Sequence, residues 1–473
     1  MAARPLSPTK AKIIYTESEA TAPLLPIKNV ADDAAEFHDG YSGASFMSAV
    51  FSLTTSVVGA GIMGLPSAVK TLGLIPGILL IVLVGLLADA GVETMLKFSS
   101  AGKAISYGGL MADSFGRIGR IVLQVCVIVN NFGILVVYLI IIGDVMSGST
   151  SGTVHHSGVL EEWAGRSTWW NSRLSVMFFT TLFILVPLVS FKHVDSLRLS
   201  SALSVALAVM FVFVMAAVTI TKLAFGLVTM PRLFPNIGNE ASLLELFEVV
   251  PVVVTAYICH QSVHPIVNEL DKSDDAPGVV RTSLALCTSI YIAMSVFGFM
   301  LFGENTMVDV LSNFDTDLGV PYSTFLCDLV RVGYALHLVL VFPLLNFTLR
   351  LNLDGILFPA AVPISLDNKR FTLTTAGIVI LIFLGAYLIP NINTAFQFTG
   401  ATAAMCIGFI FPGIVCLRDL YEISTKKERL ISWFMVVLAV TTGAIAITSD
   451  VLDLFVTESS TPSGPVGALF INE

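Results

Sequence analysis

Charged residues are scarce in this chain. Only 12% of its 473 residues are Asp, Glu, Lys or Arg, against roughly 25% in soluble domains, while 55% are hydrophobic. The formal net charge is −9, so the basic face that binds nucleic acid is missing and nucleic-acid partners are excluded. A long chain with so few charges places most of its side chains against lipid or other apolar side chains, so we expect membrane lipid around it.

Cysteine pairs and metal-ligand spacings are also missing. None of the six cysteines belongs to a CxxC motif, and none lies beside another in a polar loop. The sequence therefore predicts neither a disulfide framework nor a zinc site, and no cofactor. Each cysteine lies in or beside an apolar run, where we expect it to pack as a small hydrophobic residue.

Motifs of membrane enzymes and channels are absent too. The sequence has no HExxH, no GxSxG and no pair of intramembrane aspartates, so we do not expect an enzyme. It also shows no repeated filter loop of the kind that channels use. Residues 1–43 are polar, contain four prolines and lack the apolar core of a signal peptide. We predict a disordered cytosolic tail at 1–43.

Long apolar runs dominate the rest of the chain. A helix that crosses a bilayer needs about 20 mostly apolar residues. Backbone N–H and C=O groups in hydrocarbon must be hydrogen-bonded within the protein, so we expect these runs to be helical. We therefore predict an all-α integral membrane protein with eleven transmembrane helices at 44–450 and a short tail at 451–473. The runs cover 44–69, 73–96, 119–147, 173–190, 199–226, 243–263, 279–302, 322–349, 371–389, 393–417 and 430–450.

The loops differ in their content of Lys and Arg. With the N-terminus in the cytosol, 19 of the 25 Lys and Arg fall in cytosolic segments, 5 fall in outer segments and Arg331 lies within the eighth run. This bias follows the positive-inside rule. An odd number of spans then places the C-terminus on the lumenal or extracellular side, where the tail 451–473 has no Lys or Arg.

The first run contains helix-breaking residues near its middle. Three glycines and a proline lie within residues 59–66, directly after the Thr-Thr-Ser sequence at 54–56. Small residues can serve close helix packing, but the proline and the preceding hydroxyls favour an unwound stretch. Unwound backbone inside a membrane persists where it lines a cavity or is buried in protein. Its free N–H and C=O groups can then bind a substrate.

The sixth run changes from apolar to polar between Pro251 and Pro265. Breaks in the first and sixth spans lie five spans apart, which is typical of two inverted repeats with a binding site at the midplane between them. Half-helix N-termini suit a carboxylate, and free carbonyls suit an ammonium group or a cation. We therefore expect helices 1 and 6 to be broken and to bind a zwitterion, an amino acid, during alternating access.

Candidate substrate contacts surround these two breaks. We favour the backbone of Gly59, Ala60, Gly61 and Ile62. Side chains that could add contacts are Thr55, Ser56, Asn130, Tyr257 and Cys259. For Asn130 a structural interhelical hydrogen bond is the alternative.

The residues of these breaks resemble a known family. Residues 55–66, Thr-Ser-Val-Val-Gly-Ala-Gly-Ile-Met-Gly-Leu-Pro, resemble the first span of the amino acid/auxin permease family. That family includes the sodium-coupled neutral amino acid transporters and the vacuolar amino acid transporters of yeast and plants. Segments within 130–144, 257–260, 400–402 and 411–412 resemble its third (plant vacuolar-type), sixth and tenth spans. The resemblance covers 44–450 and implies a LeuT-like fold, two inverted five-helix repeats plus one helix, with amino acid substrates.

The coupling ion is the point at which the chain departs from sodium-coupled members. Those members have an Asn four residues before the first-span glycine and a hydroxyl on the eighth span, whereas this chain has Thr55 and no Ser or Thr at 334–337. The resemblance to vacuolar members implies proton coupling. His260 and His337 are ionisable groups within spans and are our candidates for it. For each of them a hydrogen-bonded packing role is the alternative.

Two other functions stay open. An amino acid sensor would bind without useful turnover, and a sodium-coupled amino acid symporter would use the other cation. Glu19 precedes Leu24-Leu25 and resembles an acidic dileucine sorting signal. Together with the vacuolar-type resemblance it favours a vacuolar or other endomembrane location, with the plasma membrane open.

Overall fold

The computed structural model describes residues 44–460 except 152–153, 239, 316 and 390–399. The predicted tail at 1–43 lies outside this part of the chain. The α-helices are α1 Phe46–Val57, α2 Gly61–Leu72, α3 Leu74–Gly102, α4 Tyr107–Ser147, α5 Val159–Ala164, α6 Arg173–Thr180, α7 Val186–Val189, α8 Arg198–Ala224, α9 Glu240–Ala256, α10 His260–Val267, α11 Ala276–Phe302, α12 Ser323–Leu357, α13 Asn368–Leu388, α15 Phe411–Arg418 and α16 Lys426–Ser460. Strands β1 Gly148–Ser151 and β2 Val154–Ser157 pair antiparallel.

Shorter helical pieces complete the described chain. Three of them are π-helical: η2 Thr181–Leu185 joins α6 to α7, while η8 Gly400–Ala404 and η9 Cys406–Ile410 precede α15. The 3-10 turns are η1 Trp169–Asn171, η3 Asp195–Leu197, η4 Ser273–Asp275, η5 Gly303–Asn305, η6 Val310–Asp315 and η7 Ile364–Leu366.

Each of the eleven predicted runs overlaps helix. Among the described residues, eight helices are long and apolar enough to cross a membrane, and the bent pair α1 and α2 makes a ninth candidate. Two shorter apolar helices, Arg173–Val189 and Thr402–Arg418, overlap the fourth and tenth runs, and residues 393–399 of the tenth run lie outside the described chain. Helix α16 continues to Ser460, so residues 451–460 of the predicted C-terminal tail are helical and 461–473 lie outside the described chain.

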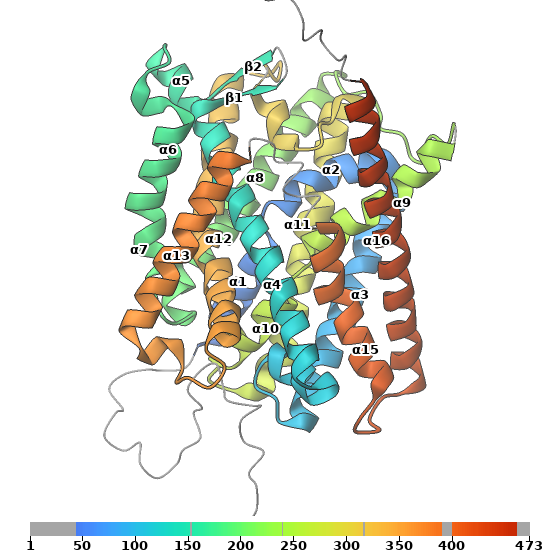
Figure 1. Cartoon of the computed structure of the whole chain (residues 1–473). Coiled ribbons are helices and arrows are strands. Elements are labelled where there is room, and N and C mark those ends of the chain that lie inside the picture. The colour runs from blue at the N-terminus through green and yellow to red at the C-terminus, as the bar shows by residue number, and fades with distance from the viewer. Residues whose placement is uncertain (1–43, 152–153, 239, 316, 390–399, 461–473) are drawn as a thin grey trace, which may run out of the picture.

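Burial separates inner helices from outer ones. In the most apolar stretch of each span, 72% of residues are buried for Glu245–Val267 and 67% for α4, against 33% for α13 and for α16. Figure 1 shows α13 and α16 on opposite flanks of the bundle, with α1, α4, α10 and α12 between them. Outer helices present large apolar side chains such as Leu86 and Leu373 to their surroundings, as lipid-facing surfaces do. We therefore expect the groups that bind a substrate on the enclosed helices.

The two ends of the bundle differ. One end, here called the hairpin end, carries β1, β2 and α5 (Figure 1). There Arg331 of α12 forms an ion pair with Glu162 of α5 at 2.8 Å and donates to the carbonyl of Ser157. The Trp163 indole donates to Asp328 at 2.9 Å. These bonds attach the segment 157–163 to the start of α12.

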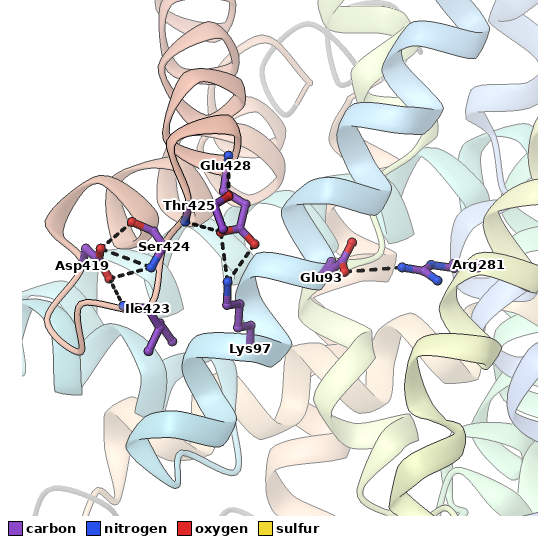
Figure 2. Close-up of polar contacts among 8 residues, drawn as sticks. All are labelled: Glu93, Lys97, Arg281, Asp419, Ile423, Ser424, Thr425 and Glu428. Carbon is purple, nitrogen blue, oxygen red and sulfur yellow. Dashed lines mark hydrogen bonds and ion pairs between the residues drawn. The ribbon is translucent and has the colours of Figure 1, made fainter.

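The opposite end, which carries Lys97 and Arg281 and is here called the basic end, contains the polar contacts in Figure 2. Lys97 at the end of α3 pairs with Glu428 of α16 at 2.8 Å, and Arg281 of α11 pairs with Glu93 at 3.4 Å. Asp419 after α15 accepts hydrogen bonds from the backbone N–H groups of residues 423 and 424. Partly exposed pairs of this kind contribute about 1 kcal/mol or less each. They fix how α3 meets its neighbours rather than holding the bundle together.

The chain bends by 58° between α1 and α2. Residues 58–60 separate the two helices, and Val58 has an extended conformation. Pro66 within α2 cannot donate a backbone hydrogen bond. Gly61 lets the bend approach the second interruption closely, because a Cβ there would lie 2.9 Å from Cα of Ala256.

The second interruption lies at residues 257–259, between α9 and α10. It disturbs the axis less, since Glu245–Val267 still qualifies as a single span. Pro251 lies in α9 and Pro265 in α10, so each half has one turn weakened by a missing N–H donor. The two interruptions thus meet in the enclosed centre, joined through Gly61 and Ala256.

Candidate functional site

The site is built on backbone groups that the two interruptions release from helical bonding. The Tyr291 hydroxyl, from α11, lies 2.9 Å from the carbonyl oxygen of Val57 and 2.6 Å from that of Ala256. Its side chain is fully buried. One phenol therefore joins the last carbonyl of α1 to the last carbonyl of α9.

The next backbone groups of the first break also meet side chains from inner helices. Nε2 of His337 lies 3.2 Å from the carbonyl oxygen of Val58. The Tyr334 hydroxyl donates to the carbonyl of Gly59 at 3.4 Å, and the N–H of Ala60 donates to the Tyr138 hydroxyl at 3.4 Å. The two longer bonds are weak by geometry. These groups can exchange their present partners for polar groups of a ligand.

Gly59 is required by the position of Tyr138. A Cβ on residue 59 would lie 1.8 Å from the Tyr138 hydroxyl oxygen. No other residue fits unless the tyrosine moves, because two non-bonded heavy atoms do not approach each other to 1.8 Å. The glycine thus lets a side chain of α4 reach the break.

The hydroxyls of Thr55 and Ser56 are bonded within the protein. Thr55 donates to the carbonyl of Ser201 on α8 at 3.0 Å, and Ser56 donates to the carbonyl of Leu53 at 2.8 Å. Both side chains are buried. Their predicted substrate role would need these bonds to open, so it stays a prediction.

Asn130 and Asn131 of α4 form an amide cluster with Gln261 of α10. Nδ2 of Asn130 donates to Oδ1 of Asn131 at 3.1 Å, and Nε2 of Gln261 donates to the same oxygen at 3.3 Å. All three side chains are at least 96% buried. Oδ1 of Asn130 and Oε1 of Gln261 have no hydrogen-bond partner among the described residues. Buried acceptors of this kind can receive donors from a ligand or water.

A cavity at the basic end lies next to this amide cluster. Gln261 and His264 of α10 line it together with the start of α4 and the end of α12. Nε2 of His264 lies 2.8 Å from the Ser99 hydroxyl, and its ring stacks on Tyr107. Because Gln261 belongs to both the cavity and the amide cluster, polar groups extend from the basic end toward the breaks.

The sixth-span candidates face away from that polar route. The Tyr257 hydroxyl donates to Thr288 of α11 at 2.9 Å. The His260 imidazole lies between α3 and η9, because a Cβ on Gly91 would be 2.9 Å from its Nε2 and one on Gly408 would be 3.7 Å from its Cε1. Neither ring nitrogen of His260 has a partner among the described residues. The structure therefore brings His337, and not His260, to the first break.

Cys259 and Ile62 complete the predicted set. Cys259 precedes α10 and is fully buried, and the side chain of Ile62 is 1% exposed. Within the described chain, no group of His, Cys, Asp and Glu residues is arranged to hold a metal ion.

Comparison with known proteins shows the family to which the sequence belongs. The sequence profile described as transmembrane amino acid transporter protein matches residues 42–453. The chain belongs to this family of transmembrane amino acid transporters. The family resemblance inferred from residues 55–66 is thereby confirmed. Its relatives are transporters, which fits a protein that is not an enzyme.

Named relatives of this transmembrane amino acid transporter cover nearly its whole length. It is 54% identical to amino acid transporter AVT6A of Arabidopsis thaliana over 93% of this chain and 94% of that protein. It is 25% identical to sodium-coupled neutral amino acid transporter 7 of Danio rerio over 86% of each chain. The manganese transporter of Eremococcus coleocola has the same fold, with a TM-score of 0.62, 12% identity and coverage of 92% and 93%.

Several side chains of this transmembrane amino acid transporter's site were missing from the sequence prediction. Tyr291, Tyr334 and Ser204 all contact the breaks or His337. A signal for one of them was present: Tyr334 and His337 lie three residues apart, hence on one face of a helix. Nothing local to Tyr291 or Ser204 indicates their partners.

Proposed function

We propose that this chain is a secondary active amino acid transporter driven by protons, with the substrate bound at residues 57–60 and 256–259. The observation that carries the proposal is a set of backbone groups that are hydrogen-bonded to side chains and can exchange these partners for a ligand. They are the carbonyls of Val57, Val58, Gly59 and Ala256 and the N–H of Ala60. The carbonyls of Val57, Val58 and Gly59 suit an ammonium group. The N–H of Ala60, near the start of α2, suits a carboxylate.

Alternating access fits the placement of the polar groups. The amide cluster and the adjoining cavity extend from the breaks to the basic end, while Tyr138 and Tyr334 contact the break from α4 and α12. We propose that substrate leaves or enters through the basic end after α1 and α10 separate from α4 and α12. The eleven predicted spans, with a LeuT-like inverted repeat and helices 1 and 6 broken, provide the symmetry for this exchange.

The orientation in the membrane is inferred from the distribution of Lys and Arg, and the compartment from a sorting pattern and the vacuolar-type resemblance. We propose that the basic end is cytosolic and the hairpin end lumenal or extracellular. A vacuolar or other endomembrane location is favoured by the Glu19 and Leu24-Leu25 pattern. In an acidic lumen, a proton symporter with this topology moves amino acids into the cytosol.

Reconstitution in liposomes tests the proposal. Uptake of a panel of labelled amino acids is measured under an imposed pH gradient, with and without sodium. The matched control is Gly61→Val, which places side-chain atoms against Ala256. We expect uptake that follows the proton gradient, ignores sodium and is lost in the control.

The other outcomes identify the rival functions. Uptake that requires sodium would show a symporter of the kind named in the Danio rerio relative. Saturable binding of an amino acid without uptake under any gradient would show a sensor. Either result overturns proton-driven transport by this chain.

A further inference from the structure

His337 has an unusual set of partners. Its Nδ1 lies 2.9 Å from the carbonyl oxygen of Ser204 and 3.0 Å from the hydroxyl of the same residue. Its Nε2 lies 3.2 Å from the carbonyl oxygen of Val58. The ring is 1% exposed and stacks on Tyr334 at 5.8 Å. One imidazole thus links α12 to α8 and to the first break.

The protonation state of the ring decides which of these bonds can form. Carbonyl oxygens only accept hydrogen bonds, and a neutral imidazole has a single N–H. Bonds to the carbonyls of both Ser204 and Val58 therefore require the doubly protonated imidazolium. The neutral ring can keep the bond to Val58 from Nε2–H, while its unprotonated Nδ1 accepts from the Ser204 hydroxyl. Each state of His337 has a complete set of partners.

We propose that His337 binds the transported proton and that Ser204 accommodates both of its states. The step is the addition of one proton to the Nδ1 lone pair, with no covalent bond broken, and its later release. On protonation the Ser204 hydroxyl turns away and the Ser204 carbonyl accepts the new N–H. This inference rests on the proposed proton coupling and assigns the group that carries it.

The surroundings support a cation without supplying a carboxylate partner. Helix α1 has no titratable side chain, and α8 has only Arg198 and Lys222 at its ends. Titratable groups on the other packed elements include Asp328, Arg331, Tyr334, Arg350 and Asp354 on α12, Tyr107, Asp113, Tyr138 and Asp144 on α4, and Asp309 and Asp315 beside or within η6. Asp144 is paired with Arg173 at 2.5 Å, and the hydrogen bonds of the ring itself go to Ser204 and Val58. Helix α1 ends at Val57, so its negative dipole end points at the ring.

The location explains how a proton could affect substrate binding. The carbonyl of Val58 belongs to the same short segment, 57–60, that we propose for the amino acid. A protonated His337 holds α8, α12 and this segment together through two charge-assisted bonds. Loss of the proton replaces the bond to the Ser204 carbonyl with one from the Ser204 hydroxyl, and it weakens the junction because neither remaining bond is charge-assisted.

Variants at two positions test the assignment in liposomes. His337→Gln has no proton to exchange but can donate to one carbonyl and accept from Ser204. We expect it to keep counterflow exchange of labelled amino acid at equal pH, while accumulation under an imposed pH gradient falls to about that without a gradient. His260→Gln, which removes the rival histidine, should keep the response to the gradient.

Ser204→Ala gives a second readout that does not depend on the fold tolerating a change at His337. It removes the donor that stabilises the neutral ring and leaves the carbonyl that stabilises the charged one. The pH midpoint of transport should therefore move upward, by about one pH unit or less, the size of one hydrogen bond. Ser200→Ala is the matched control, because Ser200 donates to Leu340 on the same α8–α12 interface at 3.0 Å, and its midpoint should not move.

The outcomes separate the two proposals. A wild-type protein that ignores the pH gradient overturns proton coupling and this assignment together. A wild-type response that survives in His337→Gln, or a midpoint unchanged in Ser204→Ala, overturns only the role of His337. Loss of the response in His260→Gln with its retention in His337→Gln would assign the proton to His260 instead.

Discussion

The bond that joins the two interruptions can be removed with one oxygen atom. Tyr291→Phe deletes the hydroxyl that serves the carbonyls of Val57 and Ala256 and leaves the ring in place. Both carbonyls lie in a fully enclosed part of the bundle. A buried acceptor left without a donor costs about 1–3 kcal/mol. Because a single phenolic proton serves both carbonyls, we expect a loss of about 2 kcal/mol of unfolding free energy, or roughly 30-fold in the folded-to-unfolded ratio.

The neighbouring tyrosine provides the control. Tyr257 packs edge-to-face on Tyr291 at 5.1 Å and donates to the Thr288 hydroxyl, which itself donates to the carbonyl of Leu284. Tyr257→Phe therefore leaves no carbonyl without a partner and should cost less than about 1 kcal/mol. Denaturant unfolding of both purified variants in the same detergent measures the difference. Equal stability of the two variants within about 0.5 kcal/mol would refute the reasoning, since additivity errors are of that size.

Three further predictions concern other parts of the molecule. Gly59→Ala should raise the KM for uptake by about 5- to 140-fold, because overpacking costs about 1–3 kcal/mol, and Tyr138→Phe in the same chain should recover part of the loss; a KM equal to wild type would contradict the 1.8 Å approach. Burial raises the pKa of Asp309, in the loop before η6, to about 6. Because this pKa lies above that of the free side chain, about 4, its stabilising effect is complete below pH 4 and is lost as the pH rises through 6. Protection factors for hydrogen exchange in the peptide spanning η6, which remove the intrinsic pH dependence of exchange, should accordingly be higher at pH 4 than at pH 7, and Asp309→Asn should abolish that difference. Arg350→Lys should lower the melting temperature, because the buried guanidinium donates to the carbonyl of Val189 and to Thr375 from Nη1 and to the carbonyl of Phe191 from Nη2, and the single nitrogen of lysine cannot occupy both positions; an unchanged melting temperature would count against this network.

The helices could be predicted from sequence because apolar length is a local property. Their ends were less accurate where charged residues extend a helix beyond the apolar run. Helix α4 begins at Tyr107 rather than near 119, since its first turns contain Asp113, Arg117 and Arg120. It also tolerates a kink at Gly116, whose φ is 68°. Helix α12 likewise continues to Leu357, beyond the predicted 349.

The position of the first bend was readable for the same reason. Glycine and proline act on the backbone where they stand, so the bend at 58–60 falls where the pattern at 59–66 points. The side chains that meet the released groups were not readable. Tyr138 is 78 residues from Ala60, and His337 is 279 residues from Val58. Such pairs depend on how the helices pack, which no local pattern contains.

The direction in which a buried side chain points could not be predicted from the sequence either. His260 and His337 look alike in sequence, as single histidines within apolar spans. One lies between α3 and η9 and the other against the first break. A histidine at the first residue of α10 can point to either side of the broken span, and only the neighbouring Gly91 and Gly408 leave room for the observed side.

The close approach of Gly61 to Ala256 limits how this bundle can move. Their backbones are near enough that a single added methyl group would collide, so we expect α2 and α9 to stay in contact at this point. We expect the two helices to move together as one rigid body. We therefore expect the helices to part elsewhere during a cycle, as proposed for α1 and α10 against α4 and α12, and not at the crossing itself.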